Sequence, residues 1–192
     1  MQDRVARYRE AAPGLKWPAS EPTVGSDGRL QGIWLLGNDY RNKTVYHGGH
    51  PPNYLMRVNA LFPDAERVLH LFSGSLPADP GYTRFDLRDD VDCDVRGDAT
   101  KLSTYFPNRK FDLIHADPPY TDEDAAHYGT PPLSRNQVVR EVYKVLEPGG
   151  YLVWLDMVLP MYKKTELELA GIIGLVRSTN HRFRCVVIFK RL

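Results

Sequence analysis

The stretch Phe111-Asp-Leu-Ile-His-Ala-Asp-Pro-Pro-Tyr120 decides the fold of this chain, because an apolar run in it ends abruptly in a carboxylate, two prolines and an aromatic ring. The apolar run predicts a strand that is buried on both faces, as in a parallel sheet. Pro118 and Pro119 must end the strand, since neither can donate a hydrogen bond to a neighbouring strand. The ligand crevice of an open α/β sheet lies at the carboxyl ends of its strands. We therefore expect Asp117 and Tyr120 to lie at an active-site edge, on a corner whose dihedrals the prolines restrict.

The length and composition predict a single domain. The chain has 192 residues, and 42% of them are hydrophobic, which is enough for one well-buried core and short for two domains. We expect residues 1–30 to form an N-terminal arm, extended apart from a short helix near residues 5–11. Residues 31–192 are then expected to form the functional domain.

Charge and cysteine content limit the kinds of partner and the cellular compartment that we expect for this chain. Cys93 and Cys185 have no metal or redox spacing, and they predict a reducing, cytoplasmic setting. The amino terminus is charged and there is no long apolar stretch, so we expect this protein to be neither secreted nor inserted in a membrane. A net charge of +1 cannot support a broad electrostatic footprint on duplex DNA. Phosphates would have to meet local clusters, namely Lys163 with Lys164, or Arg177, Arg182 and Arg184.

Patterns of apolar residues and breakers predict the other elements. We expect a hairpin of strands at 32–36 and 43–47, followed by a loop, Gly48-Gly-His-Pro-Pro52, suited to lie over a ligand. Helices are expected at 53–62 and 163–170, strands at 68–72 and 151–157, and two tail strands joined at Asn180-His181. Residues 121–132 predict a mobile flap beside the site. Ser134 and Gln137 have the spacing of a capping box, which opens a helix that ends at Glu147-Pro-Gly-Gly150.

Asp117-Pro-Pro-Tyr120 resembles the (Asp/Asn/Ser)-Pro-Pro-(Tyr/Phe/Trp) motif of S-adenosylmethionine-dependent methyltransferases that modify planar amino groups. The lone pair of such an amine is conjugated with its ring, so the nitrogen is a poor nucleophile until hydrogen bonds draw it toward tetrahedral geometry. The resemblance implies that the Asp117 side chain and the Pro118 carbonyl accept the two amine hydrogens. It also implies that Tyr120 stacks on the base. Positioning and preorganised dipoles would then supply most of the acceleration.

Further segments resemble other motifs of these methyltransferases. The strand before Phe72-Ser-Gly74 is similar to the one that ends in Phe-x-Gly-x-Gly and cradles the methionine end of the cofactor, although Leu76 replaces the second glycine. Too few residues separate Phe72 from the next strand for the usual crossover helix, so we expect that helix to be reduced to a loop. Asp86 and Asp98 correspond to the residues that hold the ribose and the adenine amino group.

The motifs and the loops beside them give three sets of candidate site residues. The set for S-adenosylmethionine is His47, Gly48, Pro51, Phe72, Ser73, Gly74, Asp86, Asp98, Ala99 and Asp117. The catalytic residues are Asp117, Pro118, Pro119 and Tyr120, and the substrate is expected to meet Tyr120, His127, Tyr128, Asn180 and His181. No metal site is expected, because His47 and His50 have no Asp, Glu or Cys partner at metal spacing.

The implied fold is an α/β, Rossmann-like class I methyltransferase fold. Its central, mostly parallel sheet would have seven strands in the order 3-2-1-4-5-7-6, with an antiparallel C-terminal hairpin and a reduced helix after the first strand.

The implied activity is methyl transfer to an exocyclic amino group of a nucleic-acid base. Our first hypothesis is adenine N6 in DNA, with an unpaired base stacked on Tyr120. The segments between strands are too short to contain a separate target-recognition domain. One alternative is an RNA base, guanine N2 or adenine N6. Another is a catalytically inactive homologue that binds nucleic acid or a partner subunit, and the oligomeric state stays open.

Overall fold

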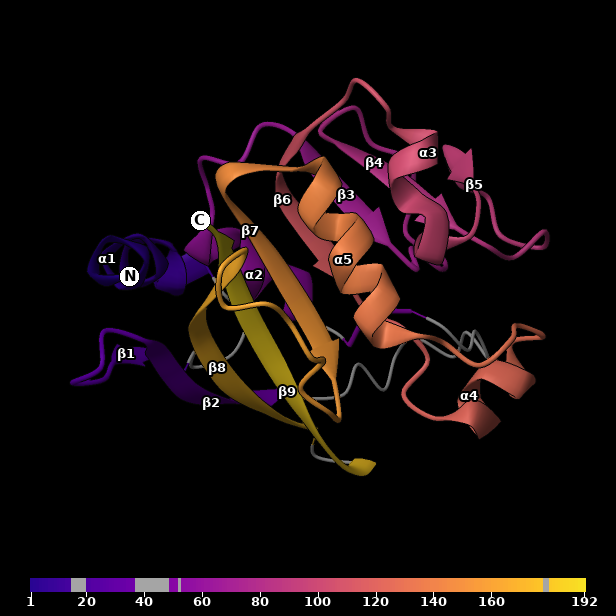
Figure 1. The fold of residues 1–192 in the computed structure, drawn as a ribbon. Helices are drawn as coiled ribbons and strands as arrows, with labels where there is room; N and C mark the ends of the chain where they lie inside the picture. The colour runs from indigo at the N-terminus through magenta and orange to yellow at the C-terminus, as the bar shows by residue number, and fades with distance from the viewer. Residues whose placement is uncertain (15–19, 37–48, 52, 178–179) are drawn as a thin grey trace.

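The computed structural model describes residues 1–14, 20–36, 49–51, 53–177 and 180–192, with only the backbone of residues 14, 180 and 181. Figure 1 shows a sheet with helices on both faces. In chain order the elements are α1 Gln2–Ala11, η1 Ala12–Gly14 (a 3-10 turn), β1 Thr23–Val24, β2 Leu30–Leu36, α2 Tyr54–Leu61, β3 Val68–Leu71, β4 Tyr82–Asp86, β5 Val95–Arg96, η2 Ala99–Lys101 (a 3-10 turn), α3 Leu102–Tyr105, β6 Phe111–Ala116, α4 Asp122–His127, α5 Arg135–Val145, β7 Leu146–Asp156, β8 Leu167–Arg177 and β9 Asn180–Arg191. Within these ranges no helix is long and apolar enough to cross a membrane.

The strand order agrees with the predicted topology. The sheet runs β1-β2-β8-β9-β7-β6-β3-β4-β5, so its last seven strands, taken from the β5 end, have the order 3-2-1-4-5-7-6. β3, β4, β5, β6 and β7 are parallel to one another, and β9 is antiparallel to both β7 and β8. The α/β fold with a C-terminal antiparallel hairpin is confirmed. Beyond these seven strands the sheet contains β2, which pairs in parallel with β8, and β1, which pairs with β2 at the sheet edge.

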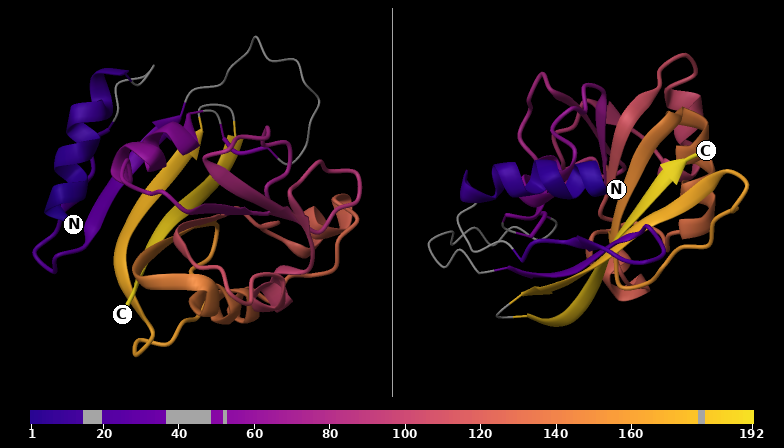
Figure 2. Two further views of the ribbon diagram at one scale, coloured as in Figure 1. Left: turned by 90° about the horizontal axis from the view of Figure 1, so that it is seen from above. Right: turned by 90° about the vertical axis from the view of Figure 1, so that its left-hand side faces the viewer.

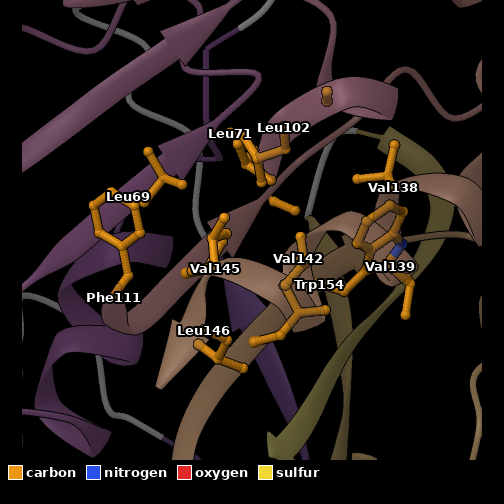
Figure 3. Close-up of a cluster of buried hydrophobic side chains, with 14 of the residues drawn as sticks. Leu69, Leu71, Leu102, Phe111, Val138, Val139, Val142, Val145, Leu146 and Trp154 are labelled. Carbon is orange, nitrogen blue, oxygen red and sulfur yellow. The ribbon is translucent and has the colours of Figure 1, made fainter. Parts of the chain in front are cut away.

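Two apolar cores lie on opposite faces of the sheet. Figure 3 shows the core under α5, where valine side chains of the helix and leucine side chains of β3, α3 and β7 lie around Trp154 and Phe111. On the other face, α1 and α2 cover Trp34, Leu155 and Ile188. Figure 2 shows α1 and α2 across the sheet from α5. Each fully buried large apolar side chain contributes roughly 1.5–3 kcal/mol to folding, so both helix layers hold the strand ends in fixed positions.

The connection from β3 to β4 contains no helix, as predicted. Phe72 and Gly74 both have positive φ values, 59° and 53°, which turn the chain sharply at the end of β3. A positive φ is unusual for a phenylalanine and costs about 1–2 kcal/mol. The loop is held by the Ser73 amide, which donates to the Phe85 carbonyl at 3.2 Å. The short crossover therefore stays tight against β4.

The short helix expected near residues 5–11 is confirmed as α1, which begins at Gln2 and packs on the sheet. α1 buries Val5 and Tyr8 against the sheet, and the Tyr8 ring stacks on Trp34 with a centroid distance of 6.0 Å. Arg57 of α2 donates to the Tyr8 hydroxyl at 2.9 Å. Local polarity concealed this packing, because only two residues of α1 face the core. The domain boundary at residue 30 stays a prediction.

Two other local predictions are wrong. Residues 163–170 form a turn and the start of β8 instead of a helix, because pairing with β9 outweighs the helix propensity of this segment. The segment at 121–132, predicted as a flap beside the site, contains α4, which the Thr121 hydroxyl caps by accepting from the Asp124 amide at 3.0 Å; its mobility stays a prediction. Ser134 makes no side-chain cap on α5, and Gln137 instead donates to Thr100 and Glu141.

The helix at 53–62 is confirmed as α2, although Asn53 caps it without a side-chain hydrogen bond. The predicted strand at 43–47 lies outside the described residues.

Candidate active site

The corner after β6 holds the Asp117 carboxylate between two donors. The Tyr120 hydroxyl donates to Asp117 Oδ1 at 2.7 Å, and His50 Nδ1 lies 3.1 Å from Asp117 Oδ2. The side chains of His50 and Asp117 are only 8% and 11% exposed, so little water competes for these bonds. Burial, followed by the charge of Asp117, raises the pKa of Tyr120 well above its ordinary value. Tyr120 is therefore a neutral hydrogen-bond donor at physiological pH, and the carboxylate has a fixed orientation.

A buried ion pair fixes the backbone of the same corner. Arg135, at the start of α5, donates to Asp156 Oδ2 at 2.7 Å and to the carbonyls of Pro119 and Tyr120 at 3.2 and 2.6 Å. Asp156 is fully buried at the end of β7 and also accepts from Trp154 Nε1. Arg135 thus occupies two of the corner's carbonyls. The carbonyl of Pro118 accepts no hydrogen bond from any described residue.

Asp117 opens into a cavity of about 530 Å³, a volume within the range of roughly 300–1,000 Å³ that drug-sized ligands occupy. The cavity lies along the carboxyl edge of the sheet. It brings together most of the residues that the sequence singled out. The predicted residues that line it are Pro51, Phe72, Gly74, Asp86, Asp98, Ala99, Asp117, Pro118, Pro119, Tyr120, His127 and Tyr128.

The β4–β5 side of the cavity is acidic and built from backbone turns. Asp86 is buried at the end of β4, where its two oxygens accept from the Gly74 amide at 2.9 Å and from the Arg88 amide at 3.0 Å. The Asp98 carboxylate caps η2 by accepting from the amide and the hydroxyl of Thr100 at 2.8 and 2.7 Å. Asp86 therefore links the glycine turn after β3 to the end of β4.

This side has the hydrogen-bond acceptors and the apolar surface that the adenosyl part of the cofactor requires. Asp86 and Asp98 offer carboxylate oxygens for hydroxyl and amino donors, while Phe72, Phe85 and Leu87 supply apolar surface for a purine ring. The Ser73 hydroxyl is buried beside Gly74 with no hydrogen-bond partner among the described residues. The carboxylates of Asp86 and Asp98 and the apolar surface beside them therefore fit the adenosyl part of the cofactor.

The β8–β9 side of the cavity is basic. Arg177, Arg182 and Arg184 line it, and Arg182 forms two hydrogen bonds with Asp124 of α4, at 2.7 and 3.1 Å. The Arg184 guanidinium lies over the Tyr120 ring, 5.0 Å from its centroid. One face of Tyr120 is therefore covered by a cation, and any base that stacks on this ring has the other face.

Three imidazoles lie under the corner, on the face of the sheet that α2 covers. His70 of β3 and His115 of β6 stack with their centroids 4.4 Å apart, and His50 lies 5.9 Å from His70. Burial, and then the neighbouring His50, lowers the pKa of His70 to about 3. Burial also lowers the pKa of His115 well below its ordinary value. Both rings are therefore neutral at physiological pH, and within the described ranges no three His, Cys, Asp or Glu side chains are placed to hold a metal ion.

Some predicted site residues are not brought to the cavity. Ser73 is buried behind the turn and does not line it. His47 and Gly48 lie outside the described residues, and the side chains of Asn180 and His181 are not described.

Sequence reasoning missed His50 as the partner of Asp117, and it noted Arg184 only as a cluster member. The dipeptide His50-Pro51 after two glycines was the available signal for His50. The contact itself spans 67 positions of sequence.

No protein-family model and no curated protein matches this chain. Among solved structures, TrmN from Thermus thermophilus is similar over 76% of this chain and 50% of its own length, with 18% identity and a TM-score of 0.55. The N-methyltransferase NodS from Bradyrhizobium japonicum WM9 is similar over 71% of this chain and 92% of its own, with 15% identity and a TM-score of 0.48. An rRNA methylase from Streptococcus thermophilus is similar over 67% and 88%, with 8% identity and a TM-score of 0.38.

The chain spans about half the length of TrmN. The likeness to TrmN and the strand order together show a Rossmann-like methyltransferase fold. Similarity at this level of identity shows the fold alone.

Proposed function

We propose that this protein transfers a methyl group from S-adenosylmethionine to an exocyclic amino group of a nucleic-acid base. The observation that carries the proposal is the corner after β6. There Tyr120 and His50 hold the Asp117 carboxylate. The next residue, Pro118, has a carbonyl that accepts no hydrogen bond from any described residue. The two acceptors are the pair that an amine with two hydrogens needs. They adjoin the cavity whose acidic side fits the cofactor.

The cofactor would be held by the acidic side and by the turn after β3. Asp86 is the candidate acceptor for the ribose hydroxyls, because a carboxylate oxygen that already accepts one amide bond keeps a second lone pair. Asp98 and Ala99 are the candidates for the adenine edge. When bound, the cofactor supplies an electrophilic methyl group.

The amine would be prepared by the protein's own dipoles. Asp117 and the Pro118 carbonyl each accept one amine hydrogen, which frees the nitrogen lone pair from conjugation with the ring. Fixed acceptors in a site with little water act more strongly than the same groups in solution. After the nitrogen gains its methyl group it must lose one hydrogen as a proton. The Asp117 carboxylate, which would already accept one of the amine hydrogens and lies 3.1 Å from His50 Nδ1, is the candidate acceptor for that proton.

Adenine N6 in DNA remains our first choice of target, and an RNA base, guanine N2 or adenine N6, remains the alternative. A base stacked on the open face of Tyr120 must be unpaired, because a base inside a duplex cannot reach a corner this deep. Single-stranded or locally opened nucleic acid is therefore the expected substrate.

Methyl transfer from tritiated S-adenosylmethionine to single-stranded DNA, duplex DNA, RNA and free nucleosides tests the proposal. The expected result is label in one modified base, identified after digestion as an N-methylated exocyclic amine. Label on a ring carbon or on an oxygen would contradict the proposal.

Calorimetry with S-adenosylmethionine tests the alternative of an inactive homologue. The proposal expects measurable binding, because the acidic side of the cavity has the required acceptors. A protein that binds nucleic acid but not the cofactor would support the inactive homologue instead.

A further inference from the structure

The basic side of the cavity contains a buried cation that no described residue neutralises. Arg184 is only 6% exposed, and its Nε and Nη1 atoms have no hydrogen-bond partner among the described residues. The guanidinium lies over the face of the Tyr120 ring, which offers no hydrogen-bond acceptor in its plane of contact. Burying a guanidinium without acceptors is costly, so such a group indicates a missing partner.

A second buried arginine, Arg84, gives a contrasting case. Arg84 of β4 is 4% exposed, and its guanidinium forms ion pairs with Asp92 and Asp94 at 3.0 and 2.9 Å. It also donates to two backbone carbonyls. The difference is that Arg84 lies away from the cavity, whereas Arg184 lines it. The acceptor for Arg184 is therefore expected to come from a ligand.

A second arginine, Arg177, lies in the same cavity as Arg184. Arg177 also lines the cavity, and burial together with repulsion from Arg184 lowers the pKa of Arg177. Two arginines that repel each other inside one cavity favour a ligand with more than one anionic oxygen. A phosphate group has such oxygens in the geometry that guanidinium groups bind best.

The strand order separates this site from the cofactor side. Arg184 lies on β9, and the turn that would hold the cofactor follows β3, with β7 and β6 between them. Three strand spacings amount to about 14 Å. Asp117 lies on the β6 corner between the two sides, so the anion near Arg184 belongs to the molecule that presents the amine.

We propose that Arg184 binds a phosphate of the nucleotide that carries the target base. The inference rests on the proposed function and narrows its substrate to a phosphorylated unit, as opposed to a free base, a nucleoside or an uncharged amine. The phosphate can belong to the backbone of a nucleic acid or to a free nucleotide. Both sources present the same oxygens, and the experiment below distinguishes them.

Binding calorimetry in the presence of S-adenosylhomocysteine tests the proposal. The ligands are adenosine, cytidine and guanosine, the 5′- and 3′-monophosphates of each, and single-stranded DNA and RNA pentamers. For the wild-type protein we expect the phosphate to improve the affinity of one nucleoside by about tenfold or more, since a charge-assisted bond to a buried arginine is strong. In Arg184→Gln this improvement should vanish while the affinity for the nucleoside stays the same.

Two controls keep the outcome decisive. Arg184→Lys retains the charge and should keep part of the phosphate effect. Arg109→Gln removes an arginine that also lies over a ring, 4.9 Å from the Phe111 centroid, but away from the cavity, and it should change nothing. A pentamer that binds more tightly than the monophosphate identifies a nucleic-acid backbone as the source, whereas equal affinities identify a free nucleotide.

The two proposals can fail separately. A phosphate effect that persists in Arg184→Gln overturns the assignment of Arg184, even if the methyl-transfer assay labels a base. A phosphate effect that depends on Arg184 in a protein that methylates no nucleic acid overturns the proposed function and leaves the anion site in place.

Discussion

The two sides of the cavity differ in charge although they share one sheet edge. On the β4–β5 side, Asp86 and Asp98 present carboxylates that backbone amides hold in place. On the β8–β9 side, Arg177 and Arg184 present guanidinium groups. Asp117 lies between them, at the end of β6. Under the two proposals above, ligands of different charge meet at this corner: a donor that brings a cationic sulfonium and hydroxyl groups, and an acceptor molecule that brings an anion.

Removing the carboxylate at the meeting point should have the largest effect. Asp117→Ala deletes one of the two amine acceptors, so we expect turnover to fall by about 100-fold or more, as for the loss of one preorganised group in other active sites. The affinity for S-adenosylmethionine should be nearly unchanged, because Asp86 and Asp98 remain. Single-turnover methyl transfer and calorimetry measure the two quantities.

The matched control for this change is Asp122→Ala, which removes an exposed carboxylate five residues further along. It should retain wild-type turnover. Substantial turnover by Asp117→Ala would refute the role of that residue and the idea that the two sides meet there.

Acid should destabilise the fold through His70, because the unfolded chain can bind a proton that the buried ring cannot. The pKa of His70 is about 3 in the folded protein, well below its value of 6.5 in the unfolded chain. Between these values the unfolded chain binds the extra proton, so this contribution to stability is fully present above pH 6.5 and falls as the pH drops toward 3. We expect His70 to account for a loss on the order of 2–3 kcal/mol between pH 7 and pH 4.5.

Urea denaturation at the two pH values measures this loss, because it gives the free energy of unfolding. His70→Phe should lose much less stability on acidification than the wild type does. His127→Gln, which changes an exposed histidine, should behave like the wild type. Equal pH dependence in the wild type and in His70→Phe would show that the buried ring does not set the acid limit.

A change on the acidic side should weaken the cofactor alone. Asp86→Asn removes the charge that holds the Gly74 amide, and it weakens the acceptor for a ribose hydroxyl. We expect the dissociation constant for S-adenosylmethionine to rise by roughly 10- to 100-fold, as for the loss of a charge-assisted hydrogen bond. The Michaelis constant for the nucleic acid should stay close to that of the wild type.

Asp89→Asn is the control, since Asp89 is exposed beside the same turn and does not line the cavity. A variant of Asp86 that weakens substrate and cofactor equally would argue against a division between the two sides.

The smallest effect is expected on the basic side, at the stacking ring. Tyr120→Ala should raise the Michaelis constant for the substrate by an amount equivalent to about 1–3 kcal/mol of lost stacking. Tyr120→Phe keeps the ring but loses the bond to Asp117, so it should lower turnover more than it weakens binding. Steady-state kinetics of the two variants separate these contributions, and an unchanged Michaelis constant in Tyr120→Ala would contradict the stacking role.

The sequence predicted the parts of this molecule that local signals determine. The prolines at 118 and 119 can only end a strand, and the buried runs that lead into Phe72, Asp86 and Asp117 have the composition of central strands. The order of the strands followed from the resemblance, and the observed sheet agrees with it. The reduced connection after β3 was also predictable, because the number of residues there is too small for a helix.

The rest depended on contacts between distant residues. Leu167-Glu-Leu-Ala170 has good helix formers, but β9 was available and the segment paired with that strand instead. The bond from His50 to Asp117 and the cation over Tyr120 join residues 67 and 64 positions apart, counting 117 − 50 and 184 − 120. No periodicity in one sequence encodes such pairs, so the basic side was visible only as three arginines close together in the chain.

The added strand β2 has a practical consequence for trimming this protein. Seven residues of β2, Leu30–Leu36, pair with β8 in parallel register, and the short β1 covers the far side of β2. A truncation that removed residues 1–36 to leave the seven-stranded unit would strip the amides and carbonyls of β8 of their partners along Gly171–Arg177. It would also uncover the core residues that Trp34 and Tyr8 shield. An exposed strand edge of this kind can pair with strands of other molecules. We therefore expect the shortened protein to aggregate on expression and the full chain not to aggregate.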